Sequence, residues 1–189
     1  GLGLNLKTYY VKRCVAVPGD TFEIRNAHYK VYGYKGTLGC VDSQDKLLQI
    51  LSIGEERNWG IVMKGFPRDS LVNWTIKEFG PLYIPAKGGR IWMTPVNGVL
   101  YRNAIEWEQK KKLMQRGDIF LLDDSIIQEY QFKEDYYFVA GDKVMNSKDS
   151  RYWGLLPEKF IVGKATLIWK SVDLNTDEIR WNRVFKRIE

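Results

Sequence analysis

The sequence predicts a mainly β fold, made of coiled antiparallel sheets that hairpins connect, together with two short helices. Short runs rich in β-branched and aromatic residues recur along the chain, as is typical of strands. Turn residues separate these runs, for example at 18–20 (Pro-Gly-Asp) and 117–118 (Gly-Asp). Only two stretches space their apolar residues by three and four, as one face of a helix requires.

The predicted strands follow the runs of β-forming residues in chain order. They are expected at 9–17, 21–25, 28–33, 90–94, 118–122, 136–140 and 160–169. The segment 56–89 contains three prolines and has weak periodicity. We therefore expect it to be a loop-rich excursion on the sheet and not a separate domain.

The two predicted helices lie between these strands. The first is expected at 42–53, with Asp42 or Ser43 as its N-cap. The second is expected at 97–113, where apolar residues share one face and the last residues are lysines. Cations at that end suit a helix C-terminus because they face the negative end of its dipole.

Size and charge limit the organisation and the partners. The length of 189 residues is enough to bury a sizeable core, and we expect a single β domain over 1–189 with a loop-rich and helical insertion at about 42–112. Lysine and arginine exceed aspartate and glutamate by 29 − 23 = 6, but the only basic run is 110–112. No nucleic-acid partner is therefore expected. The longest apolar stretch, 47–53, is far too short to span a membrane.

The cysteines and the histidine give no metal or cofactor signal. Cys14 and Cys40 lack the spacing of a metal-binding pair, and with a single histidine they cannot complete a structural zinc site. The two cysteines form either a disulfide or two free thiols. His28 lies in a turn, where a solvated histidine is the expected interpretation. We predict no cofactor and no metal.

One connecting segment, 141–154 (GDKVMNSKDSRYWG), is unusually rich in short polar and charged side chains. Taken alone, it is typical of a structural loop, because Asn and Asp close turns through bonds from the side chain to the backbone. In that interpretation Asp149 and Arg151 form an ordinary surface pair. A second segment, near the start of the chain, favours a functional interpretation.

That second segment is 9–20 (YYVKRCVAVPGD), in which a strand would place Tyr10, Lys12 and Cys14 on one face. An aromatic ring and a thiol are poor surroundings for an ammonium group. Lys12 therefore either extends from an edge strand to water or is desolvated. A desolvated lysine loses its proton more easily and can act as a general base.

These two segments together resemble the type I signal peptidases of bacteria, in the Bacteroidetes branch. That family has a Lys-Arg pair that leads into Pro-Gly-Asp, and further along a Gly-Asp-Asn block with Ser-x-Asp-Ser-Arg-Tyr-Trp-Gly and a Val-Gly-x-Ala strand. Here the first block is YYVKRCVAVPGD and the second is GDKVMNSKDSRYWGLLPEKFIVGKATLIW. The order of the blocks matches, and the resemblance covers essentially the whole chain, with looser matches at GPLYIPAKG and IRWNRVFKRIE.

The resemblance implies roles for residues of both segments. Lys12 would be the general base of a Ser-Lys dyad, and Ser147 would hydrogen-bond to the Lys12 side chain and orient it. Asp149 and Arg151 would form the ion pair that fixes the loop, and Arg13 and Asp142 would brace it from the strand side. A serine hydroxyl is a weak nucleophile until a base takes its proton, which a lysine can do without histidine.

The family's nucleophilic serine stands in a Ser-Met-x-Pro motif upstream of the lysine, and no serine of this chain has that setting. Either the chain is a truncated piece of the protein, without the anchor and the nucleophile, or it is a relative that has lost catalysis. We favour truncation, because Lys12 is present together with its expected supporting residues. Where the family has the Asn of its Gly-Asp-Asn block, this chain has Lys143. If the Lys143 side chain pointed inward, it would crowd Lys12 or weaken it further as a base. If it faced solvent, it would matter little.

The expected function is that of a membrane-anchored serine endopeptidase that removes signal peptides from exported preproteins, with its domain on the periplasmic side of the inner membrane. The alternative is a catalytically silent homologue that binds exported peptides or a secretion partner. The expected partners are signal peptides and the membrane surface. Among the tryptophans, Trp59 and Trp74 are candidates for contact with lipid headgroups, whereas Trp153, Trp169 and Trp181 are expected in the core.

Overall fold

The computed structural model describes residues 9–173 and 176–188. It divides into two compact units. The larger unit is 12–160, and the smaller one contains the described residues 9–11, 161–173 and 176–188. The single domain predicted over 1–189 stays a prediction.

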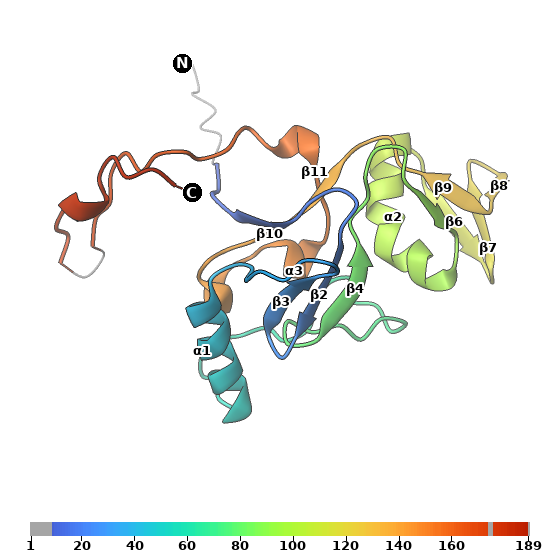
Figure 1. Ribbon diagram of the computed structural model, residues 1–189. Helices are drawn as coiled ribbons and strands as arrows, with labels where there is room; N and C mark the ends of the chain where they lie inside the picture. Colours follow the sequence, from blue (N-terminus) through green and yellow to red (C-terminus); the bar gives the residue numbers. More distant parts are fainter. Residues whose placement is uncertain (1–8, 174–175, 189) are drawn as a thin grey trace, which may run out of the picture. The chain divides into compact units, whose positions relative to one another are not determined.

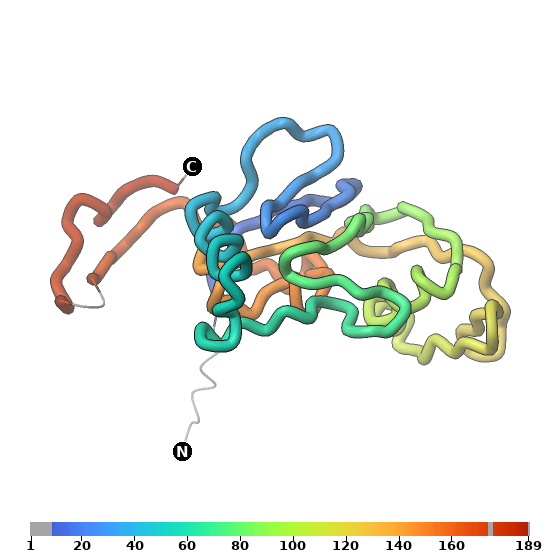
Figure 2. The backbone as a smooth tube through the Cα atoms, turned by 90° about the horizontal axis from the view of Figure 1, so that it is seen from below, coloured from blue at the N-terminus to red at the C-terminus, as the bar shows by residue number. Residues whose placement is uncertain are grey.

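The larger unit confirms the predicted mainly β class, with several small antiparallel sheets and helices between them (Figures 1 and 2). One sheet has the order β1-β10-β11, and another has the order β3-β2-β4. Their strands are β1 (Arg13–Ala16), β10 (Tyr136–Ala140), β11 (Leu156–Pro157), β2 (Thr21–Arg25), β3 (His28–Val31) and β4 (Phe79–Tyr83). The remaining strands are β5 (Arg90–Trp92), β6 (Leu113–Arg116), β7 (Ile119–Leu122), β8 (Ser125–Ile127) and β9 (Glu129–Gln131).

Most predicted strands are present, but several are shorter than predicted. The strands at 21–25 and 136–140 are confirmed with their bounds, whereas the strand predicted at 9–17 covers only 13–16. The strand predicted at 160–169 is wrong: its described residues form only an isolated bridge from Leu167 to Arg187. β4 lies within the segment predicted to be loop-rich, because Phe79 and Leu82 of this strand are core residues.

The two long helices are confirmed, with corrected ends. α1 is Val41–Ser52 and follows Cys40 as N-cap, so the prediction of Asp42 or Ser43 at that position is wrong. α2 is Pro95–Gln109, and its N-cap Thr94 accepts a hydrogen bond from the Asn97 N–H at 3.1 Å.

The lysines predicted at the end of α2 lie outside it. Lys110 has a left-handed backbone with φ 58°, which ends the helix before the lysine run. A third helix, α3 (Ser150–Trp153), is a single turn that was not predicted.

Aromatic residues join the two central sheets. The ring of Phe22 in β2 stacks on Phe138 in β10 with centroids 4.3 Å apart, and Phe79 in β4 meets Phe138 edge-on at 5.5 Å. A second buried cluster contains Leu47 of α1 and Val144, which follows β10. The connection after β10 is therefore held between the sheet core and α1, and this position is where the candidate site lies.

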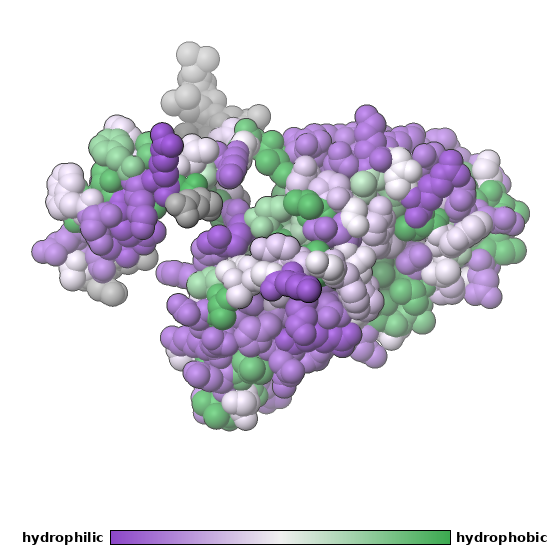
Figure 3. Space-filling view, in the orientation of Figure 1, coloured by the Kyte–Doolittle hydropathy of each residue, from purple (hydrophilic) through white to green (hydrophobic). Residues whose placement is uncertain are grey.

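The exposure of the tryptophans only partly matches the prediction. Trp153, Trp169 and Trp181 are 41%, 74% and 74% exposed, so their predicted place in the core is wrong. Trp59 is exposed as predicted, whereas Trp74 is half-buried with its ring 4.6 Å from that of Phe79. Figure 3 shows that the face around α1 is mostly hydrophilic with small apolar patches.

The smaller unit is a ladder between two antiparallel segments. The Ile168 N–H donates to the Lys186 carbonyl at 2.9 Å, and the Phe185 N–H donates to the Ile168 carbonyl at 2.7 Å. The ring of Trp169 meets that of Phe185 edge-on at 5.2 Å. Over the described part of the chain, no helix has the length and apolar character needed to cross a membrane.

Candidate functional site

The loop 141–154 connects β10 to β11 and folds around its own polar side chains. It contains a 3-10 turn, Val144–Asn146, whose Val144 is buried, and then the single turn of α3. Asp149 is the N-cap of α3, because its carboxylate accepts a hydrogen bond from the Arg151 N–H at 3.2 Å. Ser150 is buried and its hydroxyl accepts a bond from the Val139 N–H of β10 at 3.0 Å, which ties the loop to the sheet.

Lys12 meets this loop directly. In the register of β1 and β10, Arg13 lies opposite Ala140, so Lys12 lies next to the start of the loop. The Lys12 Nζ donates to the Ser147 Oγ at 2.9 Å, and both side chains are partly buried. The structure thus brings together two predicted residues that are 135 positions apart in sequence.

Gly141 makes this contact possible. A Cβ added at Gly141 would lie 2.2 Å from the Ser147 Oγ and 3.3 Å from the Lys12 Nζ. No side chain fits in that space, and glycine is needed here because of the close approach. The sequence analysis did not single out Gly141. The available signal was its position between the predicted strand 136–140 and Asp142.

Ser147 also interacts with Asp149, because its hydroxyl helps to lower the pKa of that carboxyl. In the contact between Lys12 and Ser147, the Lys12 Nζ donates and the Ser147 Oγ accepts.

Asp149 and Arg151 form a fully buried ion pair, with both side chains 0% exposed. The guanidinium donates from Nε and Nη2 to the two carboxylate oxygens, each at 2.8 Å, and the Gly141 N–H adds a third bond at 2.9 Å. The interpretation of this pair as an ordinary surface ion pair is therefore wrong.

Burial and pairing act in opposite directions on these two groups. Burial disfavours the ionised Asp149, but the hydrogen bonds and positive charge of Arg151 prevail and lower the pKa of Asp149. Burial likewise opposes the charge of Arg151, yet the bonds to Asp149 raise the pKa of Arg151. Both groups are ionised near neutral pH, and each neutralises the other inside the protein.

The two residues predicted to brace the loop, Arg13 and Asp142, form an ion pair at the surface. Arg13 donates from Nε and Nη2 to the two carboxylate oxygens of Asp142, both at 2.9 Å, with side chains 47% and 54% exposed. These bonds lower the pKa of Asp142 and raise that of Arg13. The pair joins the start of β1 to the start of the loop.

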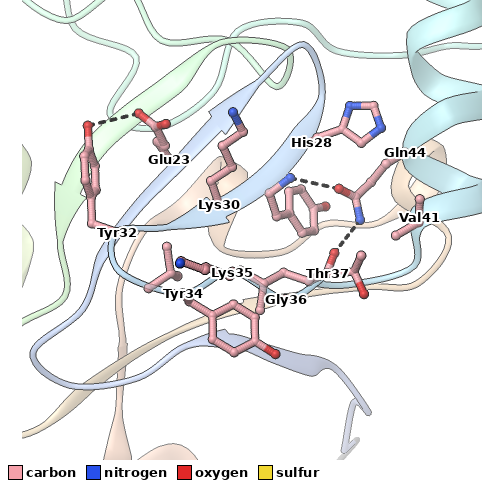
Figure 4. A pocket seen from close by; sticks show the side chains of 13 residues that line it. Glu23, His28, Lys30, Tyr32, Tyr34, Lys35, Gly36, Thr37, Val41 and Gln44 are labelled. Carbon is pink, nitrogen blue, oxygen red and sulfur yellow. Dashed lines mark hydrogen bonds between the residues drawn. The ribbon is translucent and has the colours of Figure 1, made fainter.

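The structure answers three questions that the sequence left open. Cys14 and Cys40 are free thiols. Lys143 is exposed and faces solvent. His28 is the first residue of β3 (Figure 4), directly after the turn at 26–27, so its predicted place in the turn is wrong. Its ring nitrogens contact the Asn26 carbonyl and the Asp45 carboxylate, each at 2.8 Å. Since Cys14 is also exposed, the predicted apolar strand face around Lys12 is wrong; polar neighbours in the loop hold this lysine instead.

Comparison with known proteins gives the family. The family model described as signal peptidase, peptidase S26, matches residues 84–170, a span that includes Ser147, Asp149 and Arg151. Signal peptidase I of Aquifex aeolicus is 45% identical over 164 residues, which cover 86% of this chain and 57% of that protein. Signal peptidase I of Buchnera aphidicola subsp. Acyrthosiphon pisum is 29% identical over 183 residues, which cover 93% of this chain and 54% of that protein.

The chain belongs to the type I signal peptidases. It spans about half the length of the curated relatives that it matches over most of its own residues. Lys12 lies outside the span of the family model, so its assignment depends on its sequence motif and on its contact with Ser147.

Proposed function

We propose that this protein is a serine endopeptidase that removes signal peptides from exported preproteins, with Lys12 as the general base. The observation that carries the proposal is the hydrogen bond between the Lys12 Nζ and the Ser147 Oγ. Behind that bond is the buried pair of Asp149 and Arg151. This arrangement supports a lysine with a defined orientation, which a base needs before it can take a proton in a reaction.

The reaction follows from the chemistry of such a lysine. The neutral Lys12 amine takes the proton of a serine hydroxyl as that oxygen attacks the carbonyl carbon of the scissile peptide bond. The tetrahedral intermediate collapses to an acyl-enzyme, and the leaving amine receives the proton from Lys12. Lys12 then activates a water molecule, which hydrolyses the ester, and backbone N–H groups stabilise the oxyanion in both steps.

Ser147 is not suited to be that nucleophile. Its oxygen accepts a hydrogen bond from Lys12, so Lys12 cannot act on it as a base without rearrangement. Ser150 is buried and bonded to β10. We therefore propose that neither Ser147 nor Ser150 is the attacking serine.

The proposed substrate is an extended peptide that adds as a β-strand, with small side chains entering shallow pockets at the positions before the cleaved bond. The proposed setting is the outer face of the inner membrane. Trp59 is the candidate for contact with lipid headgroups, because it is exposed and the Lys46 ammonium lies 5.1 Å from its ring centroid. Trp59→Ala should weaken binding to anionic liposomes. Trp74→Ala, at a half-buried tryptophan, is the control and should leave that binding unchanged.

The experiment that tests the function compares variants of the full-length protein on a precursor with a signal peptide. Lys12→Met should abolish cleavage, whereas Lys148→Met, at an exposed lysine of the loop, should leave it intact. Ser147→Ala should reduce cleavage less than Lys12→Met does, because it removes only the orienting partner. Cleavage by Lys12→Met at the wild-type rate would refute the proposal. Binding of signal peptides without any cleavage by the wild type would instead support the silent homologue.

A further inference from the structure

We propose that residues 62–66, which we call the supporting segment, position the loop 141–154, and that Gly65 is a positioning residue of the site. This inference rests on the proposed function, since it concerns the orientation of Lys12. The supporting segment belongs to the excursion 56–89, which the sequence analysis expected to be loop-rich. In the structure it lies against α3, the turn that contains Arg151.

Two hydrogen bonds join the supporting segment to α3. The Phe66 N–H donates to the Arg151 carbonyl at 2.7 Å, at the short end of the usual range for such a bond. The Tyr152 hydroxyl donates to the Val62 carbonyl at 3.1 Å, across 90 positions of sequence. The supporting segment therefore holds α3 by the backbone of one residue and by the side chain of the next.

Gly65 lies where the two segments approach most closely. A Cβ added at Gly65 would lie 3.0 Å from the Arg151 carbonyl oxygen, 3.5 Å from the Phe79 ring and 3.6 Å from the Thr75 carbonyl carbon. The backbone of Gly65 does not have the left-handed conformation that favours glycine. The close approach to Arg151 is therefore what excludes a side chain at this position.

Other contacts prevent the two segments from moving apart. The Gly65 N–H donates to the Trp74 carbonyl at 3.0 Å, which holds the supporting segment from behind. The loop is tied to β10 by the bond from the Val139 N–H to the Ser150 hydroxyl at 3.0 Å. Because the Arg151 side chain is also fully buried, a carbon atom added at Gly65 would have to displace the backbone of Arg151.

Such a displacement would reach Lys12 through a chain of direct contacts. The Arg151 guanidinium donates to the Asp149 carboxylate, which in turn accepts the Gly141 N–H at 2.9 Å. Gly141 lies directly against the contact between the Lys12 Nζ and the Ser147 Oγ. Gly65 therefore acts on the rate through the orientation of other groups and does not touch the substrate.

The test adds a single carbon atom. In the full-length protein, Gly65→Ala should lower kcat for precursor cleavage by about tenfold or more with KM unchanged, because misplacing a catalytic group by about 1 Å can cost roughly a hundredfold in rate. The matched control is Gly98→Ala, whose added Cβ would overlap the buried Phe120 ring. This control should lower the melting temperature through overpacking and leave kcat unchanged at temperatures where the protein is folded.

A second variant removes a contact without adding an atom. Tyr152→Phe deletes only the bond to the Val62 carbonyl and should also lower kcat, by less than Gly65→Ala does. Its matched control is Tyr101→Phe, which deletes the bond from another hydroxyl to the Tyr83 carbonyl at 3.0 Å. This control should keep the wild-type kcat.

The outcomes separate positioning from a general structural effect. A wild-type kcat for Gly65→Ala, or an equal loss of kcat in Gly98→Ala, would overturn the inference. If Gly65→Ala does not fold, Tyr152→Phe decides: a reduced kcat supports the inference and a wild-type kcat overturns it. Lys12→Met distinguishes the two proposals. If it retains wild-type activity, the proposed function fails, and if it is inactive while Gly65→Ala is fully active, only the role of the supporting segment fails.

Discussion

Asp149→Asn tests whether the buried ion pair stabilises the loop in the way its geometry indicates. The substitution keeps the shape of the side chain and removes its charge. In the structure, the Asp149 carboxylate accepts two bonds from the Arg151 side chain, one from the Arg151 N–H and one from the Gly141 N–H. An asparagine has one oxygen acceptor, and its amino group would face an N–H donor.

The expected loss of stability is large because Arg151 cannot reach water when its partner is removed. Its side chain is 0% exposed, and removing one partner of a buried pair typically costs about 3–5 kcal/mol. For a chain of this size, 1 kcal/mol lowers the melting temperature by roughly 2–4 °C. We therefore expect Asp149→Asn to lower the melting temperature by about 10 °C.

The assay is thermal and urea unfolding of the 189-residue chain, followed by circular dichroism. Asp142→Asn is the matched control, since it removes the same charge from the exposed pair with Arg13. Exposed pairs contribute about 0–1 kcal/mol, so the control should change stability little. If Asp149→Asn unfolds at the same temperature as Asp142→Asn, the buried pair does not stabilise the loop and the reasoning is refuted.

Three further predictions concern Gly141, Glu108 and the charge of Asp149. Gly141→Ala should abolish cleavage by the full-length protein, because the added Cβ would displace Ser147 from Lys12; Gly117→Ala, with no atom within 4 Å of its added Cβ, should remain active. Glu108→Gln should lower the free energy of unfolding in urea by about 1–3 kcal/mol. The reason is that the Glu108 carboxylate accepts bonds from the Tyr130 and Tyr136 hydroxyls and from two backbone N–H groups. An equal loss of stability from Glu129→Gln, in an exposed pair, would contradict this. Folding lowers the pKa of Asp149 from its ordinary value of 3.8. The contribution of Asp149 to stability is therefore complete above pH 3.8 and is lost as the pH falls through the lower pKa of the folded state. The free energy of unfolding should accordingly fall less steeply with acid in Asp149→Asn than in the wild type.

Local patterns in the sequence were sufficient for the fold class and for most elements. The runs of β-branched and aromatic residues at 21–25 and 136–140 predicted β2 and β10 with their bounds, and apolar spacing predicted α1 and α2. Such patterns depend on neighbours along the chain, which the sequence contains. They did not indicate the three-residue strands β8 and β9, because pairing with another strand determines these.

The sequence motifs also identified Lys12, Ser147, the Asp149–Arg151 pair and the bracing residues Arg13 and Asp142, since each stands in a recognisable block. What those residues experience depends on the tertiary structure. Burial turns Asp149 and Arg151 from an apparent surface pair into a fully enclosed one, and only the close approach of Ser147 explains why residue 141 is a glycine. Exposure and contact between distant segments result from the packing of the whole unit, which no short stretch of sequence encodes.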